Sequence, residues 1–367
     1  MPSVSANSHT RISRLFQKEN AGVGLYENIW PDTLALWVAQ GYPAAGDGRP
    51  ADPVDVFGFD LGRVGAAFDA APWPGRYVLL EQTEAWEIVE NSAGVVEKRW
   101  RTKSAPPGHL SFRLTDRDVW ESEFKPEFLR TDDKRIPVKR LRADIDRHRA
   151  TGRWVCFNTS FIWENLRQAM GDVCLYESLI DDPAFIRDYN QTMLDFYIRH
   201  FERTFDTVGI TDGLWFSEDL AYNQGLFCSP LALRELYLPF YNTLIDFLHK
   251  RGMKVILHSC GNITAALPII AEAGFDGLHP LQIHAGCDPL RIAREYGDRL
   301  VLIGGLDTHL LEEGDHAKIR QEQIRLIHGM RDAGAGYIFS SDHSISTNVR
   351  YDTYLRVLET YHQYAGR

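Results

Sequence analysis

His258 and Cys260 are the residues of this sequence whose types and spacing point most directly to chemistry. They stand at the end of a short apolar run, 254–257. Side chains two residues apart on an extended chain lie on the same face, so the imidazole and the thiol should be neighbours. Such a pair suits a borderline-soft metal ion such as zinc. An isolated pair is equally well explained by a buried cysteine beside a hydrogen-bonded histidine.

The same arrangement recurs, because other short apolar runs also lead into polar or ionisable side chains. These runs are 213–216, 275–278, 300–303 and 336–339. The residues of interest that follow them are Glu218, Asp219, His279, Gln282, Asp307 and His343. The recurrence favours a shared functional site over a set of unrelated core residues.

Segments with apolar residues at helical spacing separate the strand-like runs. The predicted helices cover 183–205, 230–250, 263–273, 316–331 and 351–364. Alternation of strands and helices at this spacing predicts parallel strands joined by crossover helices.

An open doubly wound sheet and a closed barrel both fit this alternation. No glycine-rich phosphate-binding fingerprint opens the series, as a nucleotide-binding open sheet would require. Polar side chains follow many successive strands, whereas an open sheet collects them at one switch point. The sequence therefore predicts an α/β fold of the (β/α)8 TIM-barrel type.

Length and charge restrict the class of protein. The chain has 367 residues and a formal net charge of -10, which argues against nucleic acid or an anionic membrane as a partner. No apolar run reaches membrane-spanning length, and residues 1–10 lack the apolar core of a signal peptide. Five scattered cysteines suit reduced thiols rather than a disulfide framework. We therefore expect a cytoplasmic protein.

One domain over 1–367 accounts for the chain, although its two parts are organised differently. Residues 151–367 hold the regular strand–helix repeats. Residues 1–150 form an elaborated amino-terminal part that starts with a short strand and a helix over 31–40. Within this part, the pattern predicts a β-hairpin flap over 77–101.

Three stretches of the sequence resemble the uroporphyrinogen decarboxylase superfamily, namely 257–262, 304–307 and 336–345. Residues 27–33 and 57–60 are similar to a divergent branch of that superfamily. The resemblance extends over roughly the whole chain and is strongest in its carboxyl-terminal part. It implies a (β/α)8 barrel, in agreement with the strand–helix alternation.

The superfamily contains at least two chemistries, and its decarboxylase branch fits this sequence less well. That branch acts on tetrapyrrole acetates without a metal or cofactor and carries an arginine-rich amino-terminal segment. Residues 26–40 here contain neither arginine nor lysine. A polyanionic porphyrinogen needs several cationic partners to offset the desolvation of its carboxylates. We therefore expect no activity on uroporphyrinogen.

The second branch holds zinc-dependent methyltransferases that exchange methyl groups with corrinoid proteins, coenzyme M or tetrahydrofolate. Its members have a His-x-Cys motif at a strand end and a later cysteine near the last strand. His258 and Cys260 match the motif, while the chain offers Asp342 or His343 in place of the later cysteine. The resemblance thus implies zinc ligands at His258, Cys260 and His343. The chain has no corrinoid-binding module, so a partner protein would carry that cofactor.

Three carboxylates are predicted to act in catalysis: Asp307, Glu218 and Asp219. Asp307 follows a Gly-Gly turn that lets backbone approach a ligand, and it could act as acid or base or instead cap the next helix. Glu218 could be a labile metal ligand or a carboxylate that orients a ligating histidine. Asp219 could be catalytic or pair with an arginine.

Substrate contacts are predicted from residues at several strand ends and loops. They are Glu27, Trp30, Asp60, His279 and Gln282. His279 precedes a proline and could instead satisfy a backbone carbonyl, while Asp60 could simply end a loop.

Three functions remain open from the sequence. The leading prediction is a zinc-dependent methyltransferase or demethylase component that moves a methyl group between a small substrate and a corrinoid, thiol or folate carrier. The alternative is a metal-independent decarboxylase of a small carboxylic acid, and the third is a non-catalytic ligand or corrinoid-partner binder. The predicted partners are a small-molecule substrate, a corrinoid protein and, in a homodimer, a second copy of the chain.

Overall fold

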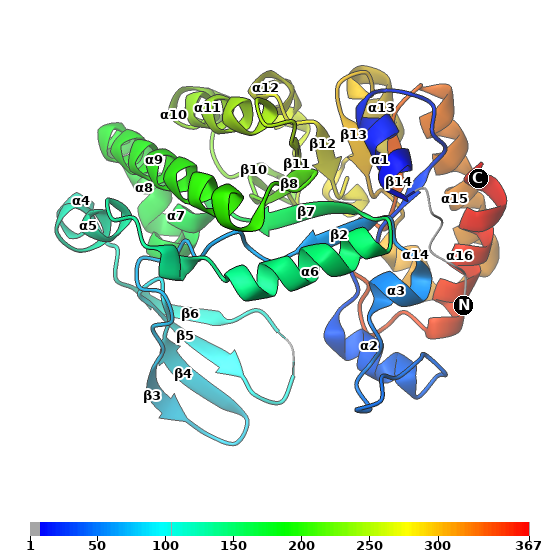
Figure 1. Cartoon of the computed structure of the whole chain (residues 1–367), viewed down its shortest axis with the longest axis horizontal. Coiled ribbons are helices and arrows are strands. Elements are labelled where there is room, and N and C mark those ends of the chain that lie inside the picture. Colours follow the sequence, from blue (N-terminus) through cyan, green and yellow to red (C-terminus); the bar gives the residue numbers. More distant parts are fainter. Residues whose placement is uncertain (1–7, 104, 367) are drawn as a thin grey trace.

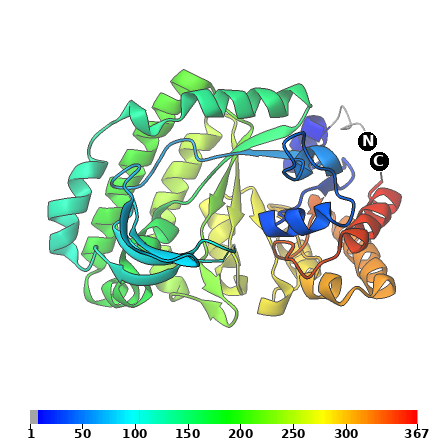
Figure 2. The ribbon, with the colours of Figure 1, turned by 90° about the horizontal axis from the view of Figure 1, so that it is seen from below.

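Eight parallel strands form one sheet that curves into a barrel (Figure 1). The computed structural model describes residues 8–103 and 105–366. The strand order is β1-β14-β13-β12-β11-β8-β7-β2, and helices surround the sheet (Figure 2). This arrangement confirms the predicted (β/α)8 TIM barrel. The barrel strands are β1 (Gly24–Leu25), β2 (Leu61–Val64), β7 (Trp154–Thr159), β8 (Gly213–Ser217), β11 (Lys254–His258), β12 (Gly277–His279), β13 (Val301–Ile303) and β14 (Tyr337–Phe339).

Three long helices begin at the residues that the apolar spacing predicts. They are α9 (Pro183–Val208), α15 (His316–Asp332) and α16 (Tyr351–Tyr364). Among the described helices, none is both long and apolar enough to cross a membrane. The described residues also form the helices α1 (Ser8–Phe16), α2 (Pro31–Val38), α3 (Pro53–Phe57), α4 (Arg117–Val119), α5 (Lys125–Phe128), α6 (Val138–Ala150), α7 (Ile162–Met170), α8 (Asp172–Asp181), α12 (Leu267–Ala273), α13 (Pro289–Tyr296) and α14 (Thr308–Glu313). Short 3-10 or π turns lie at Trp120–Phe124, Asp133–Arg135, Thr264–Ala266 and Ile283–Ala285.

The single helix predicted over 230–250 is in fact two helices, α10 (Pro230–Leu236) and α11 (Leu238–His249). Pro239 lies in the first turn of α11. A proline has no backbone N–H to donate to the preceding turn, so the helix cannot continue through this position. The break therefore falls at Tyr237.

Between β2 and β7 the chain inserts a separate antiparallel sheet that extends away from the barrel (Figure 1). Three of its strands fall in the flap predicted over 77–101, and the fourth, β6, was not predicted. Pro106 and Pro107 precede β6 and interrupt the local strand pattern. The flap is thus a four-stranded sheet, made of β3 (Val78–Gln82), β4 (Trp86–Glu90), β5 (Val95–Trp100) and β6 (Gly108–Phe112).

Helix α1 fills the amino-terminal end of the barrel. Its residues Ile12, Leu15 and Phe16 pack against inward-facing side chains of the strands. Phe16 stacks on Trp154 of β7 with 5.1 Å between the ring centroids. A second and larger apolar core lies between the outer face of the sheet and the helices. Because α1 fills one end, a ligand can enter the barrel only from the carboxyl end of the strands.

Asp60 closes the seam between the two edge strands, β1 and β2. Its backbone amide donates to the Leu25 carbonyl and its carboxylate accepts from the Leu25 amide, both at 2.8 Å. The Ser8 hydroxyl and the Arg11 guanidinium donate to the same buried carboxylate at 2.6 and 2.8 Å. Asp60 directly precedes β2 and so lies toward the amino-terminal end of the barrel. The structure thus places Asp60, for which the sequence predicts a substrate contact, at the seam, where β1 and α1 engage its carboxylate oxygens.

Asp60→Ala should destabilise the fold, because it removes a buried acceptor that a cation and a backbone amide share. Breaking a buried ion pair typically lowers the free energy of unfolding by about 3–5 kcal/mol. Urea denaturation followed by circular dichroism measures this loss. The control is Asp47→Ala, which removes a solvent-exposed pair with Arg49 and should change the stability little. Equal stability of the two variants would contradict the role of Asp60 in closure.

Candidate metal centre

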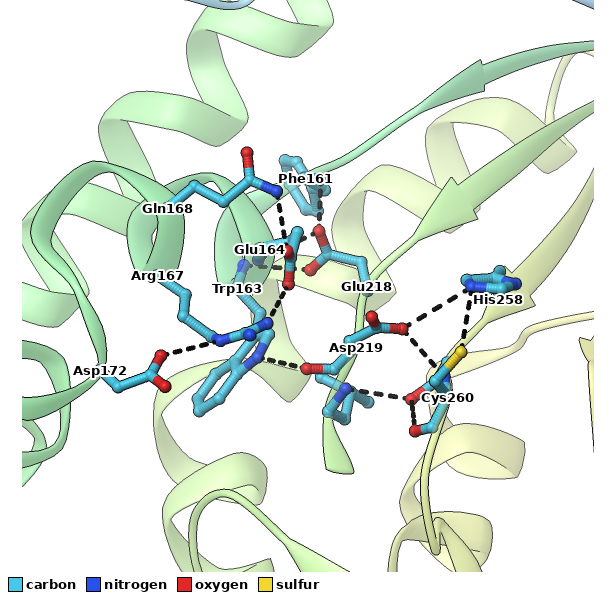
Figure 3. A network of polar contacts seen from close by, with 12 residues as sticks. Phe161, Trp163, Glu164, Arg167, Gln168, Asp172, Glu218, Asp219, His258 and Cys260 are labelled. Carbon is cyan, nitrogen blue, oxygen red and sulfur yellow. Dashed lines mark hydrogen bonds and ion pairs between the residues drawn. The ribbon is translucent and has the colours of Figure 1, made fainter. Parts of the chain in front are cut away.

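Asp219, His258 and Cys260 meet at the carboxyl end of the barrel (Figure 3). One potential ligand atom from each residue lies within 4.8 Å of the other two. The His258 Nε2 atom is 3.6 Å from Cys260 Sγ and 3.7 Å from Asp219 Oδ1. An imidazole nitrogen, a thiol sulfur and a carboxylate oxygen at this spacing form a donor set that suits zinc.

Two neighbouring strands bring these residues together. β8 and β11 pair in parallel, so the segments that follow them leave the sheet side by side. The Cys260 amide donates to Asp219 Oδ1 at 2.8 Å and thereby links the two segments. Gly261 has a φ of +84°, and a Cβ there would lie 2.5 Å from the backbone of Ala221. Glycine at this position therefore lets the loop after β8 pack closely on the loop that carries Cys260.

His279, at the end of β12, fixes the orientation of His258. The two Nδ1 atoms are 2.7 Å apart, and the rings stack with 4.9 Å between their centroids. Burial lowers the pKa of His258 to about 4 and the pKa of His279 well below its ordinary value. Both rings are therefore neutral near pH 7, so one Nδ1 donates a proton to the other. With that proton on His258, its Nε2 lone pair is free to bind a metal ion beside Asp219 and Cys260.

The Cys260 side chain is a thiol at neutral pH. Burial raises the pKa of this thiol to about 12, and the carboxylates of Asp219 and Asp342 act in the same direction. A metal ion must displace the thiol proton, because the thiolate is the metal ligand. Metal binding at this site is therefore coupled to the release of a proton.

A cavity of about 220 Å³ lies next to this donor set. His343 lines the cavity, but among the described residues it is not part of the group whose ligand atoms lie within 4.8 Å. The structure thus places Asp219, rather than the predicted ligand His343, beside His258 and Cys260. Three protein ligands next to an open position are typical of catalytic zinc sites. The cavity is lined by Asn28, Arg63, Trp215, Ser217, His258, Cys260, His279, Pro280, His343 and Ser344.

Glu218 is the sequence neighbour of Asp219, but its carboxylate faces helix α7 (Figure 3). The carboxylate accepts hydrogen bonds from the backbone amides of Phe161 and Trp163 and from the Tyr241 hydroxyl. Burial raises the pKa of Glu218 to about 7, and these hydrogen bonds oppose the rise. The structure thus places Glu218, for which the sequence predicts a catalytic or ligating role, outside the donor set among the described residues, with its oxygens bound to the first amides of α7.

Glu27 and Asp342 also bind backbone groups at the carboxyl end of the barrel. Glu27 accepts from the Ser341 amide at 3.0 Å and from the Ser341 hydroxyl at 2.7 Å. Asp342 accepts from the amides of Thr308 and Ile283 at 2.9 and 3.0 Å. Burial raises the pKa of Glu27 to about 7. Glu27 thus joins the ends of β1 and β14, where the sequence predicts a substrate contact.

Asp307 lies outside the cavity, at the start of α14. Its Oδ1 accepts from the His309 amide at 2.8 Å, so Asp307 caps α14. The same oxygen is 2.8 Å from His284 Nε2, and the rings of His284 and His309 stack at 3.7 Å between centroids. These three residues form a second, more exposed group with ligand atoms within 4.8 Å of one another. No contact places Asp307 beside the first donor set among the described residues.

The remaining predicted contacts are divided between the cavity and its surroundings. His279 lines the cavity. Gln282 supports the loop after β11, because its Oε1 accepts from the Gly261 amide at 2.8 Å. Trp30 precedes α2, is 38% exposed and is not among the residues that line the cavity.

Arg63 is the cationic residue of the cavity that the sequence analysis does not predict. It lies on β2, where successive side chains point to opposite faces of the sheet. Val64 packs in the outer core, whereas Arg63 shares the inward face with Leu61. Its guanidinium lies over the Trp215 ring, 4.6 Å from the centroid. An arginine inside a short apolar segment was the available signal, because a charged side chain on a buried strand face needs a partner or a ligand.

Comparison with known proteins identifies a family for the carboxyl-terminal part of the chain. Residues 214–364 match the family model described as Uroporphyrinogen decarboxylase (URO-D). The matched segment contains Asp219, His258 and Cys260. The match confirms the resemblance that the sequence motifs predict. No curated protein sequence matches the chain.

Solved structures with a similar fold include a methyltransferase from Methanosarcina mazei. It is 12% identical, with a TM-score of 0.65 over 97% of this chain and 98% of that chain. A GH5-4 broad specificity endoglucanase from Clostridium longisporum is 11% identical, with a TM-score of 0.46 over 96% and 98% of the two chains. At these identities the first likeness supports the barrel fold alone, and the second is too distant to carry an argument.

One zinc ion per chain should bind at Asp219, His258 and Cys260. Cys260→Ala and Asp219→Asn should each weaken zinc binding at least about tenfold, because each removes one donor atom. His343→Ala is the matched control and should bind zinc like the unchanged protein. Competition with a chromophoric chelator measures the affinities. If His343→Ala lost zinc while Asp219→Asn retained it, the ligand set predicted from the sequence would be the right one.

Zinc affinity should rise with pH by about tenfold per pH unit between about pH 5.5 and 8. In this range His258, with a pKa of about 4, is already neutral, while Cys260, with a pKa of about 12, still holds its proton. Binding of each ion therefore releases one proton, and a higher pH favours the complex. Calorimetry in buffers of different ionisation enthalpy counts the protons released. A count of two near pH 7 would contradict the neutral state of His258.

Proposed function

We propose that this member of the uroporphyrinogen decarboxylase superfamily is a zinc-dependent methyltransferase that moves a methyl group between a small substrate and a carrier. The carrier would be a corrinoid, a thiol or a folate. The observation that carries the proposal is the convergence of Asp219, His258 and Cys260 beside a small cavity.

The donor set fits zinc by chemistry and by number. His258 Nε2, Cys260 Sγ and Asp219 Oδ1 would hold the ion and leave a fourth position for another ligand. Bound zinc supplies Lewis acidity and lowers the pKa of a thiol or water that it ligates. This chemistry serves methyl transfer, since it activates a thiol acceptor or polarises the heteroatom of a methyl donor.

Neighbouring groups orient the donor set and line the cavity beside it. His279 holds the imidazole of His258 through the contact of the two Nδ1 atoms. The amide of Cys260 holds the Asp219 carboxylate. Trp215 adds an apolar wall to the cavity. In such a partly apolar site, electrostatic interactions with a substrate are stronger than they are in water.

The size of the cavity favours a small substrate. Its volume of about 220 Å³ lies below the range of roughly 300–1,000 Å³ that is usual for drug-sized ligands. A tetrapyrrole is larger than this space, and among the described residues that line it Arg63 is the one arginine. These features support the expectation that uroporphyrinogen is not a substrate.

A corrinoid carrier would be delivered by a partner protein to the carboxyl end of the barrel. Ser217 borders both the small cavity and a wider hollow of about 740 Å³. The hollow gives room beside the small cavity for a carrier group. It supports a two-substrate reaction at this end of the barrel.

Methyl transfer should depend on zinc occupancy. The assay offers methoxylated aromatics, methylamines and small thioethers to the zinc-loaded protein, with a corrinoid protein or tetrahydrofolate as acceptor, and detects methylated acceptor by mass spectrometry. Turnover should increase in proportion to bound zinc. Cys260→Ala should lose zinc and turnover together, because it removes a ligand.

The control for this assay is His328→Ala. His328 is an exposed histidine that belongs neither to the donor set nor to the residues that line the cavity. It should retain both zinc and turnover. Carbon dioxide release from a small carboxylic acid by metal-free protein, at the rate of the zinc-loaded protein, would overturn the proposal and favour the decarboxylase hypothesis.

A further inference from the structure

Arg63 is a cation inside the barrel. It projects from β2 into the interior, where its Nη1 donates to the Tyr26 hydroxyl at 2.5 Å. Its guanidinium carbon lies 4.6 Å from the centroid of the Trp215 ring and 6.0 Å from that of Tyr26. Two aromatic side chains from β8 and from the segment after β1 therefore hold the guanidinium in place.

The positive charge of Arg63 has no carboxylate partner among the residues that the structure describes. Its hydrogen bond to Tyr26 is with a neutral phenol, and its Nε is buried without a hydrogen-bond partner. A buried charge is costly unless an opposite charge compensates it. The guanidinium therefore lines the cavity without a direct ion pair to a described carboxylate.

The carboxylates at this end of the barrel are engaged elsewhere. Glu27 and Asp342 accept hydrogen bonds from backbone amides, and Asp219 accepts from the Cys260 amide. None of the three forms an ion pair with Arg63 in the described part of the chain. Among the described residues Arg63 thus has no direct carboxylate partner, and a ligand that enters the cavity can supply one.

Arg63 and two residues of the candidate metal site share one cavity. Arg63, His258 and Cys260 all line the space of about 220 Å³. That space corresponds to roughly seven water molecules at about 30 Å³ each, which is enough for a small organic acid. A planar guanidinium is suited to a carboxylate, because its N–H groups match the two oxygens.

We propose that the cavity binds a small monocarboxylic acid whose carboxylate pairs with Arg63. The methyl-bearing heteroatom of this acid then faces Asp219, His258 and Cys260. The placement of the methyl group beside the donor set rests on the proposed function. The pairing of the carboxylate with Arg63 is independent of it. A methoxy- or methylthio-substituted acid is the substrate class that satisfies both ends of the cavity.

Binding of small acids to zinc-free protein tests the carboxylate site separately from the metal. The probes are acetate, methoxyacetate and benzoate, each compared with its neutral amide by ligand-observed NMR and calorimetry after chelator treatment. The acids should bind the unchanged protein at least roughly tenfold more tightly than the amides, because only the acids supply a counter-ion. Arg63→Met should remove this preference, and Arg63→Lys should retain part of it.

The exposed Arg49→Met is the matched control and should bind the acids like the unchanged protein. If Arg63→Met does not fold, the preference for acids over amides is compared between Arg63→Lys and the unchanged protein. Lysine keeps the charge and loses the planar geometry, so this preference should be weaker in Arg63→Lys. Equal binding of acids and amides by the unchanged protein, or an unchanged preference in Arg63→Met, would overturn the proposal. Zinc content measured on the same samples reports separately on the proposed function, since Arg63 is not part of the donor set.

Discussion

Buried carboxylates that accept backbone N–H groups hold the carboxyl end of this barrel together. At the ends of parallel strands the chain leaves the sheet, and its amides lose their ladder partners. Glu218 satisfies the first amides of α7, Glu27 binds the segment after β14, and Asp342 binds the segments after β12 and β13. A buried amide without such an acceptor would cost about 1–3 kcal/mol. The positions of the surrounding loops, and hence the shape of the cavity, depend on these contacts.

Because several carboxylates accept backbone N–H groups, few of them are left to bind a metal ion or a substrate. Glu218 and Asp219 are adjacent in the sequence, yet one faces α7 and the other faces His258 and Cys260 (Figure 3). Asp219 accepts one backbone hydrogen bond, and the same oxygen lies near the imidazole. Among the described carboxylates, it is the one that joins the metal-type group at this cavity.

Burial sets the charges inside the cavity. His258 and His279 are neutral and the Cys260 thiol is protonated, because a low-dielectric interior disfavours their charged forms. The guanidinium of Arg63 lowers the pKa of both histidines further. Neutral imidazoles are competent metal ligands, so His258 can bind zinc without first losing a proton.

The sequence by itself determined the barrel and the pair His258 and Cys260. Both follow from local rules, since strand–helix alternation depends on apolar spacing and a two-residue separation on a strand puts side chains on one face. Only the tertiary structure decided that Asp219 joins this pair in place of His343, that Glu218 faces α7, and that Arg63 lines the cavity. Past the end of a strand, the direction of a side chain depends on which distant backbone groups need an acceptor, and sequence spacing carries no record of those contacts.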